Sequence, residues 1–174
     1  MTLPNQTRGL IAATSAIFWA FNSGSAANAG DTYLDAMAAC QEAAASAEDL
    51  TDYKCDWKKV VEGAPGSALT GRYKFREEGM SGEMTILEPG DGPADIGIST
   101  VTESPNAPTC SAGFGASRND NDELAATMDD PESCEVRIVS VPGPSIVKVT
   151  VTEACNSFCG MGAAFEGEWQ LQTK

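Results

Sequence analysis

From residue 70 onward, apolar and polar side chains alternate along the chain with a period of two. The segment Gly71–Arg76 (GRYKFR) shows this most clearly, because Tyr73 and Phe75 would share one face of a strand and its three cations the other. Further strands are predicted at 83–88, 95–102, 109–116, 123–128, 134–141, 146–152 and 163–171. Turns rich in Gly, Pro and Asp separate these segments, so the region reads as eight short strands joined by short connections.

This strand pattern is typical of an antiparallel meander, and closing a meander into a barrel removes its open edges. We therefore expect a mainly β fold over residues 70–174: a small eight-stranded antiparallel barrel or flattened barrel, with a two-sheet sandwich as the alternative. In a closed barrel the first strand pairs with the eighth. The first strand carries a basic stripe, which consists of Arg72, Lys74 and Arg76. We expect this stripe to face Glu166 and Glu168, above an interior filled by Tyr73, Phe75, Phe165 and Trp169.

The segment that precedes the strands has a helical pattern instead. Residues 31–50 are rich in alanine, and larger side chains recur at helical spacing at Leu34, Met37, Cys40, Gln41 and Ala44. A second short segment is predicted at 53–61, and Gly and Pro in residues 62–67 indicate a turn. The sequence therefore predicts an N-terminal helical segment, residues 30–69, ahead of the barrel.

The first residues have the pattern of a secretory signal peptide. Gly9–Phe21 is an apolar run of 13 residues, too short to span a bilayer as a helix, and Ala27-Asn28-Ala29 fits the small-residue cleavage pattern. We expect residues 1–29 to be removed on export. The mature chain would then have no transmembrane anchor and a periplasmic or secreted location.

All six cysteines fall in the predicted mature chain, at Cys40, Cys55, Cys110, Cys134, Cys155 and Cys159. An even count in an exported domain predicts three structural disulfides. Cys40–Cys55 is the expected first pair, because both residues precede the strands. Cys155 and Cys159 could close a tight loop together, or each could reach Cys110 or Cys134. Their C-x-x-x-C spacing does not match the C-x-x-C spacing of thiolate zinc sites or catalytic dithiols.

Charge and composition exclude several function classes. The chain has 25 acidic and 11 basic residues, a formal net charge of -14, and no histidine. Histidine-dependent catalysis is therefore excluded, and the acidity argues against a nucleic-acid partner. The acidic residues Asp120, Asp122, Asp129 and Asp130 do not form a calcium loop, because an EF-hand counted from Asp120 would place Ala125 and Pro131 where Gly and Glu are required. We expect no cofactor and no metal.

Two carboxylate pairs, Glu77/Glu78 and Glu166/Glu168, raise the question of a hydrolase. Glycosidase chemistry needs one carboxyl group with a raised pKa in a cleft. Neighbours along a strand point to opposite faces, and Glu166 and Glu168 lie on the predicted polar face. We therefore expect a protein that is not an enzyme.

The C-terminal part of the chain has a layout that resembles a known family. Cys110 and Cys134 are followed by Cys155-x3-Cys159-Gly160 and by a closing A-x-F-x-G-x-W pattern that ends at Trp169. This resembles the C-terminal segment of LprI-type lysozyme-inhibitor-like exported bacterial proteins, and the barrel is similar in architecture to c-type lysozyme inhibitors. The resemblance implies a periplasmic protein that protects peptidoglycan from lysozyme. It assigns no inhibitory residue.

The resulting expectation is an exported periplasmic binding protein that inhibits lysozyme-type peptidoglycan hydrolases. Its acidic surface would suit a basic lysozyme as protein partner by charge complementarity. The same charge would also serve solubility alone. The alternatives are an envelope-associated structural domain without enzymatic activity and a carboxylate-dependent hydrolase.

Overall fold

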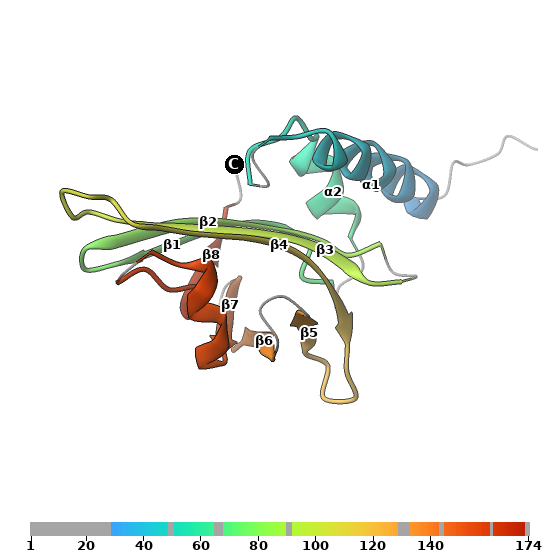
Figure 1. The fold of residues 1–174 in the computed structure, drawn as a ribbon. Helices are drawn as coiled ribbons and strands as arrows, with labels where there is room; N and C mark the ends of the chain where they lie inside the picture. The colour runs from blue at the N-terminus through green and yellow to red at the C-terminus, as the bar shows by residue number, and fades with distance from the viewer. Residues whose placement is uncertain are drawn as a thin grey trace, which may run out of the picture.

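The computed structural model describes residues 29–48, 51–64, 68–89, 92–128, 133–142, 145–160 and 162–172. The predicted signal peptide lies outside these residues except for Ala29, which begins the first helix. Two α-helices precede the strands and a short 3-10 helix, η1, precedes the last strand (Figure 1). The elements in chain order are α1 (Ala29–Ala45), α2 (Trp57–Gly63), β1 (Gly71–Glu77), β2 (Met80–Leu87), β3 (Ala94–Thr102), β4 (Thr109–Arg118), β5 (Leu124–Met128), β6 (Cys134–Val141), β7 (Ile146–Val151), η1 (Glu153–Phe158) and β8 (Gly167–Leu171).

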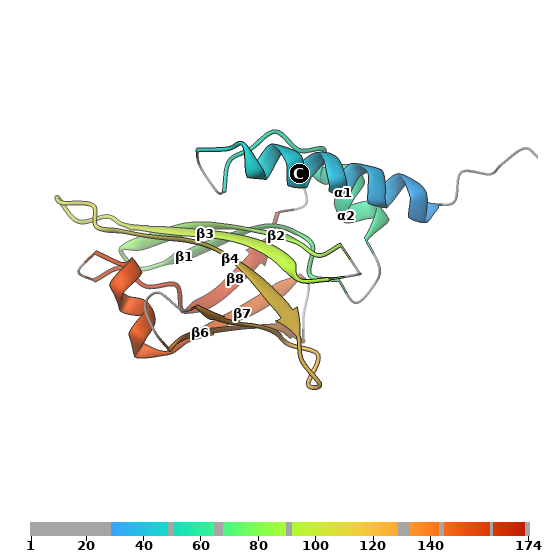
Figure 2. The same cartoon turned by 45° about the vertical axis from the view of Figure 1, so that its right-hand side comes forward.

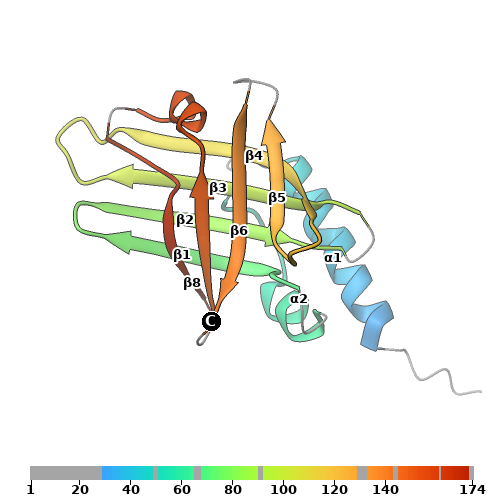
Figure 3. The same cartoon turned by 90° about the horizontal axis from the view of Figure 1, so that it is seen from below.

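The eight strands form a closed antiparallel barrel in chain order, which confirms the predicted fold. The barrel is flattened: β5–β8 run across β1–β4, so two four-stranded layers face one another (Figure 3). Two narrow corners join the layers. At one corner β1 meets β8 through Tyr73–Leu171 and Lys74–Gln170, and at the other the β4–β5 pairs are Ser117–Ala125 and Arg118–Leu124. Each corner is therefore closed by only two residue pairs.

Most strand limits fall within a few residues of the predicted ones, and the differences have local causes. β2 begins at Met80 rather than at residue 83, because the turn is confined to Glu78 and Gly79, where Gly79 has a φ of 77°. β8 begins at Gly167 rather than at residue 163. Gly167 has a φ of 145°, which interrupts the extended chain, and residues 163–166 lie outside the strand. The connection between the strands predicted at 146–152 and 163–171 contains the 3-10 helix η1.

The helices form a separate layer on the outer face of β1–β4 (Figure 2). Tyr33, Met37, Cys40 and Val60 pack on Leu87 of β2 and form a small second core. Polar contacts fix the layer: the Tyr33 hydroxyl donates to the Glu88 carbonyl, and Gln41 Nε2 donates to Asp95 Oδ2 at 2.8 Å. Tyr33 occupies the buried position that helical spacing suggested for Leu34, which is 52% exposed.

Candidate functional site

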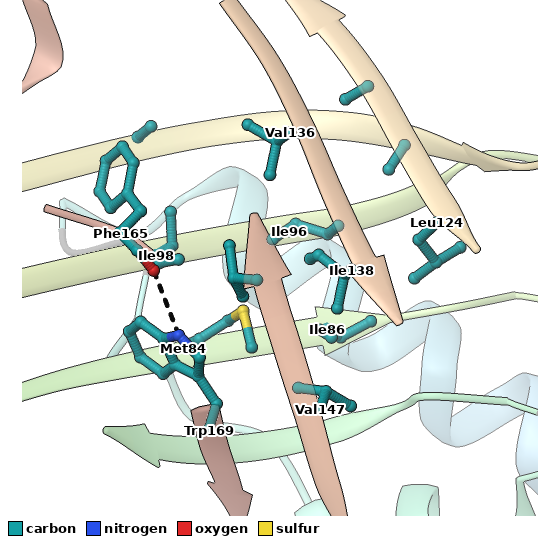
Figure 4. Close-up of a cluster of buried hydrophobic side chains, with 14 of the residues drawn as sticks. Met84, Ile86, Ile96, Ile98, Leu124, Val136, Ile138, Val147, Phe165 and Trp169 are labelled. Carbon is teal, nitrogen blue, oxygen red and sulfur yellow. Dashed lines mark hydrogen bonds between the residues drawn. The ribbon is translucent and has the colours of Figure 1, made fainter. Parts of the chain in front are cut away.

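The inside of the barrel is filled by side chains. The largest fully buried residues there are Trp169, Phe75, Phe165, Met84, Ile86, Ile98, Leu124, Ile138 and Val136. Several of them converge in Figure 4, where the Trp169 indole nitrogen donates to the Phe165 carbonyl at 3.2 Å. The predicted interior set of Tyr73, Phe75, Phe165 and Trp169 is therefore correct. The interior of the barrel is therefore a packed hydrophobic core.

The six cysteines form three disulfides, as predicted: Cys40–Cys55, Cys110–Cys159 and Cys134–Cys155. The first holds α1 against the segment before α2, as expected from its position. The other two resolve the alternatives, because Cys155 and Cys159 do not pair with each other. They connect the η1 region to β6 in one layer and to β4 in the other. These two disulfides cross-link the layers on the side of the barrel where β4 and β5 separate. Three disulfides are typical of proteins in an oxidising compartment.

A partly buried ion pair lies at one end of the barrel, and the sequence analysis did not predict it. Arg118 at the end of β4 donates through Nε and Nη2 to the two carboxylate oxygens of Glu88, both at 2.8 Å, and through Nη1 to Asp122 Oδ1 at 2.8 Å. The Leu69 amide also donates to Glu88 at 2.9 Å. Burial lowers the pKa of Arg118, but the hydrogen bonds and charges of Glu88 and Asp122 outweigh burial and raise that pKa overall.

This ion pair has a structural role, because both carboxylate oxygens of Glu88 accept hydrogen bonds from groups of the protein itself. The sequence carries no local signal for it, because the two residues are 30 positions apart. The order of the strands could have suggested this ion pair. Alternate strands of an antiparallel meander run in the same direction, so the ends of β2 and β4 bring Glu88 and Arg118 to the same end of the barrel.

The expected partners of the basic stripe were wrong, although the strand pairing was right. Lys74 Nζ lies 3.3 Å from Glu83 of β2, and Arg72 lies 3.5 Å from Glu83 and 3.7 Å from Asp52. Glu83 is directly opposite Lys74 in the β1–β2 register, whereas Glu168 is opposite Lys148 of β7. Beyond Lys74, β1 and β8 diverge at the corner, so the stripe meets the neighbouring hairpin strand instead.

The carboxylates that the sequence analysis considered for hydrolase chemistry lie on the surface. Glu77, Glu78, Glu166 and Glu168 are all exposed. Asp120 and Asp122 sit in the β4–β5 hairpin, where Asp122 binds Arg118; Asp129 and Asp130 lie outside the described residues. Within the described part of the chain, no group of three or more metal-ligating side chains comes together.

The outer surface has hollows. One of them, here called the α1–β4 pocket, has a volume of about 340 Å³ and lies between the last turns of α1 and the sheet. Its walls are Gln41, Ala44, Ala45, Tyr53, Thr85, Asp95, Ile96, Gly97, Gly113 and Phe114. Burial raises the pKa of the Tyr53 hydroxyl. A wider depression of about 640 Å³ lies over β1–β3, where Lys74 and Arg76 adjoin Ser81, Ser99 and Val101.

The fold and these surfaces define a disulfide-linked β-barrel with a filled interior, an attached helical layer and hollows on its outer surface. No protein-family model, curated protein or solved structure matched the chain. Among the helices of the described residues, none has the length and apolar character needed to cross a membrane.

Proposed function

We propose that this protein is an exported, non-enzymatic binding protein of the periplasm or extracellular space, and that its partner is a basic lysozyme-type peptidoglycan hydrolase that it inhibits. The filled interior carries the proposal. Small barrels that bind small molecules hold them inside, and here Trp169, Phe75 and Phe165 occupy that space with exposures of 2% or less. A binding role therefore falls to the outer surface, which suits a macromolecular partner.

The charge of that surface supports a basic partner. The chain carries 25 acidic residues, and exposed carboxylates lie at the ends of several strands, among them Glu77 and Glu78 at the tip of the β1–β2 hairpin and Glu103 at the tip of the β3–β4 hairpin. A field of one sign speeds the encounter with a protein of opposite charge and adds specificity. The disulfides would hold such a surface rigid outside the cell, and the C-terminal resemblance to LprI-type proteins suggests the same class of partner.

Inhibition of lysozyme tests the proposal. The rate at which a c-type lysozyme clears a suspension of bacterial cell walls is measured with increasing amounts of the oxidised mature protein, at low and at physiological ionic strength. We expect stoichiometric inhibition that weakens with salt, because exposed charges are screened.

The matched control separates recognition from general acidity. The variant Glu77→Gln/Glu78→Gln/Glu103→Gln removes three carboxylates from the hairpin tips, and Glu42→Gln/Glu62→Gln/Glu135→Gln removes three exposed carboxylates elsewhere. The first should weaken inhibition more than the second. Full lysozyme activity at a large excess of the protein would reject the proposal. Release of soluble fragments from peptidoglycan by the protein alone would favour the hydrolase alternative instead.

A further inference from the structure

The barrel has one stretch of strand edge that its own chain leaves uncovered. β4 is paired with β3 along Thr109–Ala116, but on its other side it meets β5 only at Ser117 and Arg118. Cys159 and Gly160 cover the opposite end, where the Gly160 amide donates to the Thr109 carbonyl at 2.8 Å. The free edge thus runs from Ser111 to Gly115.

The hydrogen bonds at the two ends show which residues direct their main-chain groups to this edge. On the β3 side, the Thr102 amide donates to Pro108; on the β5 side, the Asn119 amide donates to Glu123. Residues alternate sides along an antiparallel strand, and the β3–β4 register is unbroken. The N–H and C=O groups of Ser111, Gly113 and Gly115 therefore point to the open side. No main-chain partner for them on that side is found among the described residues.

The side chains at this edge do not protect it. Proteins usually guard open edges with charged side chains, prolines or covering segments. The corner between β1 and β8 follows that rule, because the outward residues of β1 there are Lys74 and Arg76. At the β4 edge the outward residues are serine and glycine, all exposed. On the outer face, a strand laid beside β4 would therefore meet no bulky side chain of β4 between Ser111 and Gly115.

The α1–β4 pocket opens beside the same edge. Gly113 and Phe114 of β4 form part of its wall, Ala44 and Ala45 form the opposite wall, and the exposed carboxylate of Asp95 lies in it. An outward side chain on an added strand, placed next to Gly113, would be directed over this pocket. A basic side chain fits its chemistry, since the aliphatic stem would contact the alanines while the cation meets Asp95.

We propose that the β4 edge, Ser111–Gly115, binds an extended segment of a basic protein by strand addition, with a Lys or Arg side chain of that segment in the α1–β4 pocket. Main-chain hydrogen bonds would supply affinity and the pocket would select the side chain. Charge favours this occupant over a second copy of the chain, because two copies would each carry a net charge of -14. The inference rests on the proposed function only in needing a basic protein partner.

The experiment uses the full mature protein and a labelled octapeptide of alternating lysine and valine, followed by fluorescence anisotropy. Two control peptides isolate the contributions: glutamate replaces lysine in one, and in the other alternate backbone amides of the lysine–valine peptide are N-methylated. We expect the unmodified basic peptide to bind, and N-methylation to weaken binding roughly tenfold or more through lost hydrogen bonds. The acidic peptide should not bind. Amide hydrogen exchange at Ser111, Gly113 and Gly115 should slow in the complex.

Two protein variants complete the test. Gly113→Pro removes a donor from the open edge without touching the β3–β4 hydrogen bonds, and should abolish binding. Asp95→Asn keeps the edge and should weaken binding of the basic peptide only a few-fold, with a smaller salt dependence. Ser140→Ala, at an exposed position of β6 away from the β4 edge, is the control and should bind like the wild type.

Equal affinity for the N-methylated and unmodified basic peptides, without amide protection at the edge, would overturn the proposal and indicate general attraction to an acidic surface. That result does not require Gly113→Pro to fold. Lysozyme assays separate this inference from the proposed function: lysozyme inhibition that survives Gly113→Pro rejects the β4 edge as the binding site while the proposed inhibitor function stands. Peptide binding with edge protection, but without lysozyme inhibition, supports the edge and rejects lysozyme as the partner.

Discussion

The ring of Phe75 on β1 stacks on the indole of Trp169 on β8, with centroids 5.1 Å apart and planes inclined by 28°. The stack lies at the corner where only Tyr73 and Lys74 pair with the last strand. Aromatic packing therefore reinforces a closure that main-chain hydrogen bonds secure over a short distance. This contact joins the first and the last strand of the barrel.

We predict that Trp169→Ala destabilises the protein by about 3–5 kcal/mol, because it leaves a large cavity in the core and removes the stack. Chemical denaturation followed by circular dichroism measures the change. The neighbouring exposed residue offers a control, since Glu168→Ala should change the free energy of unfolding by no more than about 0.5 kcal/mol. Equal effects of the two substitutions would contradict the assigned closure.

Gly167 is expected to be intolerant of a side chain for two reasons. Its φ of 145° is rarely adopted by other residues, and a Cβ at this position would collide with the ring of Phe75. Gly79 has a φ of 77° but open space around it. Gly79→Ala should therefore cost about 1 kcal/mol from backbone strain alone, and Gly167→Ala clearly more. Thermal unfolding of the two variants compares them; a smaller loss for Gly167→Ala would show that the Phe75 contact is absent.

The disulfides should make unequal contributions to the two cores. Removal of Cys110–Cys159 by alanine substitution should lower the free energy of unfolding of the barrel by about 3–4 kcal/mol, as expected for a long closed loop. Removal of Cys40–Cys55 should mainly speed amide exchange in α1, because that bond lies within the helical layer. Denaturation and hydrogen exchange provide the two readouts. The oxidised wild type should show no titratable thiol; detection of one would contradict the assigned pairing.

Alkaline pH should weaken the fold through its tyrosines. Burial raises the pKa of Tyr73, with a further contribution from the charge of Glu88, and burial also raises the pKa of Tyr33 and Tyr53. Their stabilising contribution is complete below the ordinary tyrosine pKa of 10.0. It is lost as the pH rises above that value, because the unfolded chain then releases protons that the folded chain retains.

Denaturation midpoints measured at increasing pH test this expectation. The midpoint should fall above about pH 10, where unfolded tyrosines ionise. Tyr73→Phe removes one of the groups, together with its hydrogen bond to the Leu69 carbonyl at 2.8 Å, and should flatten the decline. A midpoint in the wild type that stays constant through this range would show that these hydroxyls are not buried as described.

Local patterns along the chain were sufficient for the element types and the overall architecture. A period of two at Gly71–Arg76 and regularly spaced turns predict the strands, because alternation places one face of each strand in the core. The regular succession of short strands then predicts a closed meander. The pairing of Cys40 with Cys55 followed from their closeness in the chain. These properties depend on neighbours in sequence, so the sequence by itself determined them.

The properties on which the proposed binding depends are set by neighbours in space, and only the tertiary structure decided them. Glu83 rather than Glu168 binds Lys74, because the strand register and the divergence at the corner set the distances. Cys155 and Cys159 reach opposite layers because η1 lies between those layers. The open edge at Gly113 exists because β4 and β5 separate after two residue pairs, and the crossing of two strand layers causes that separation. A pattern of side chains encodes which face is buried, but it does not encode where two strands part.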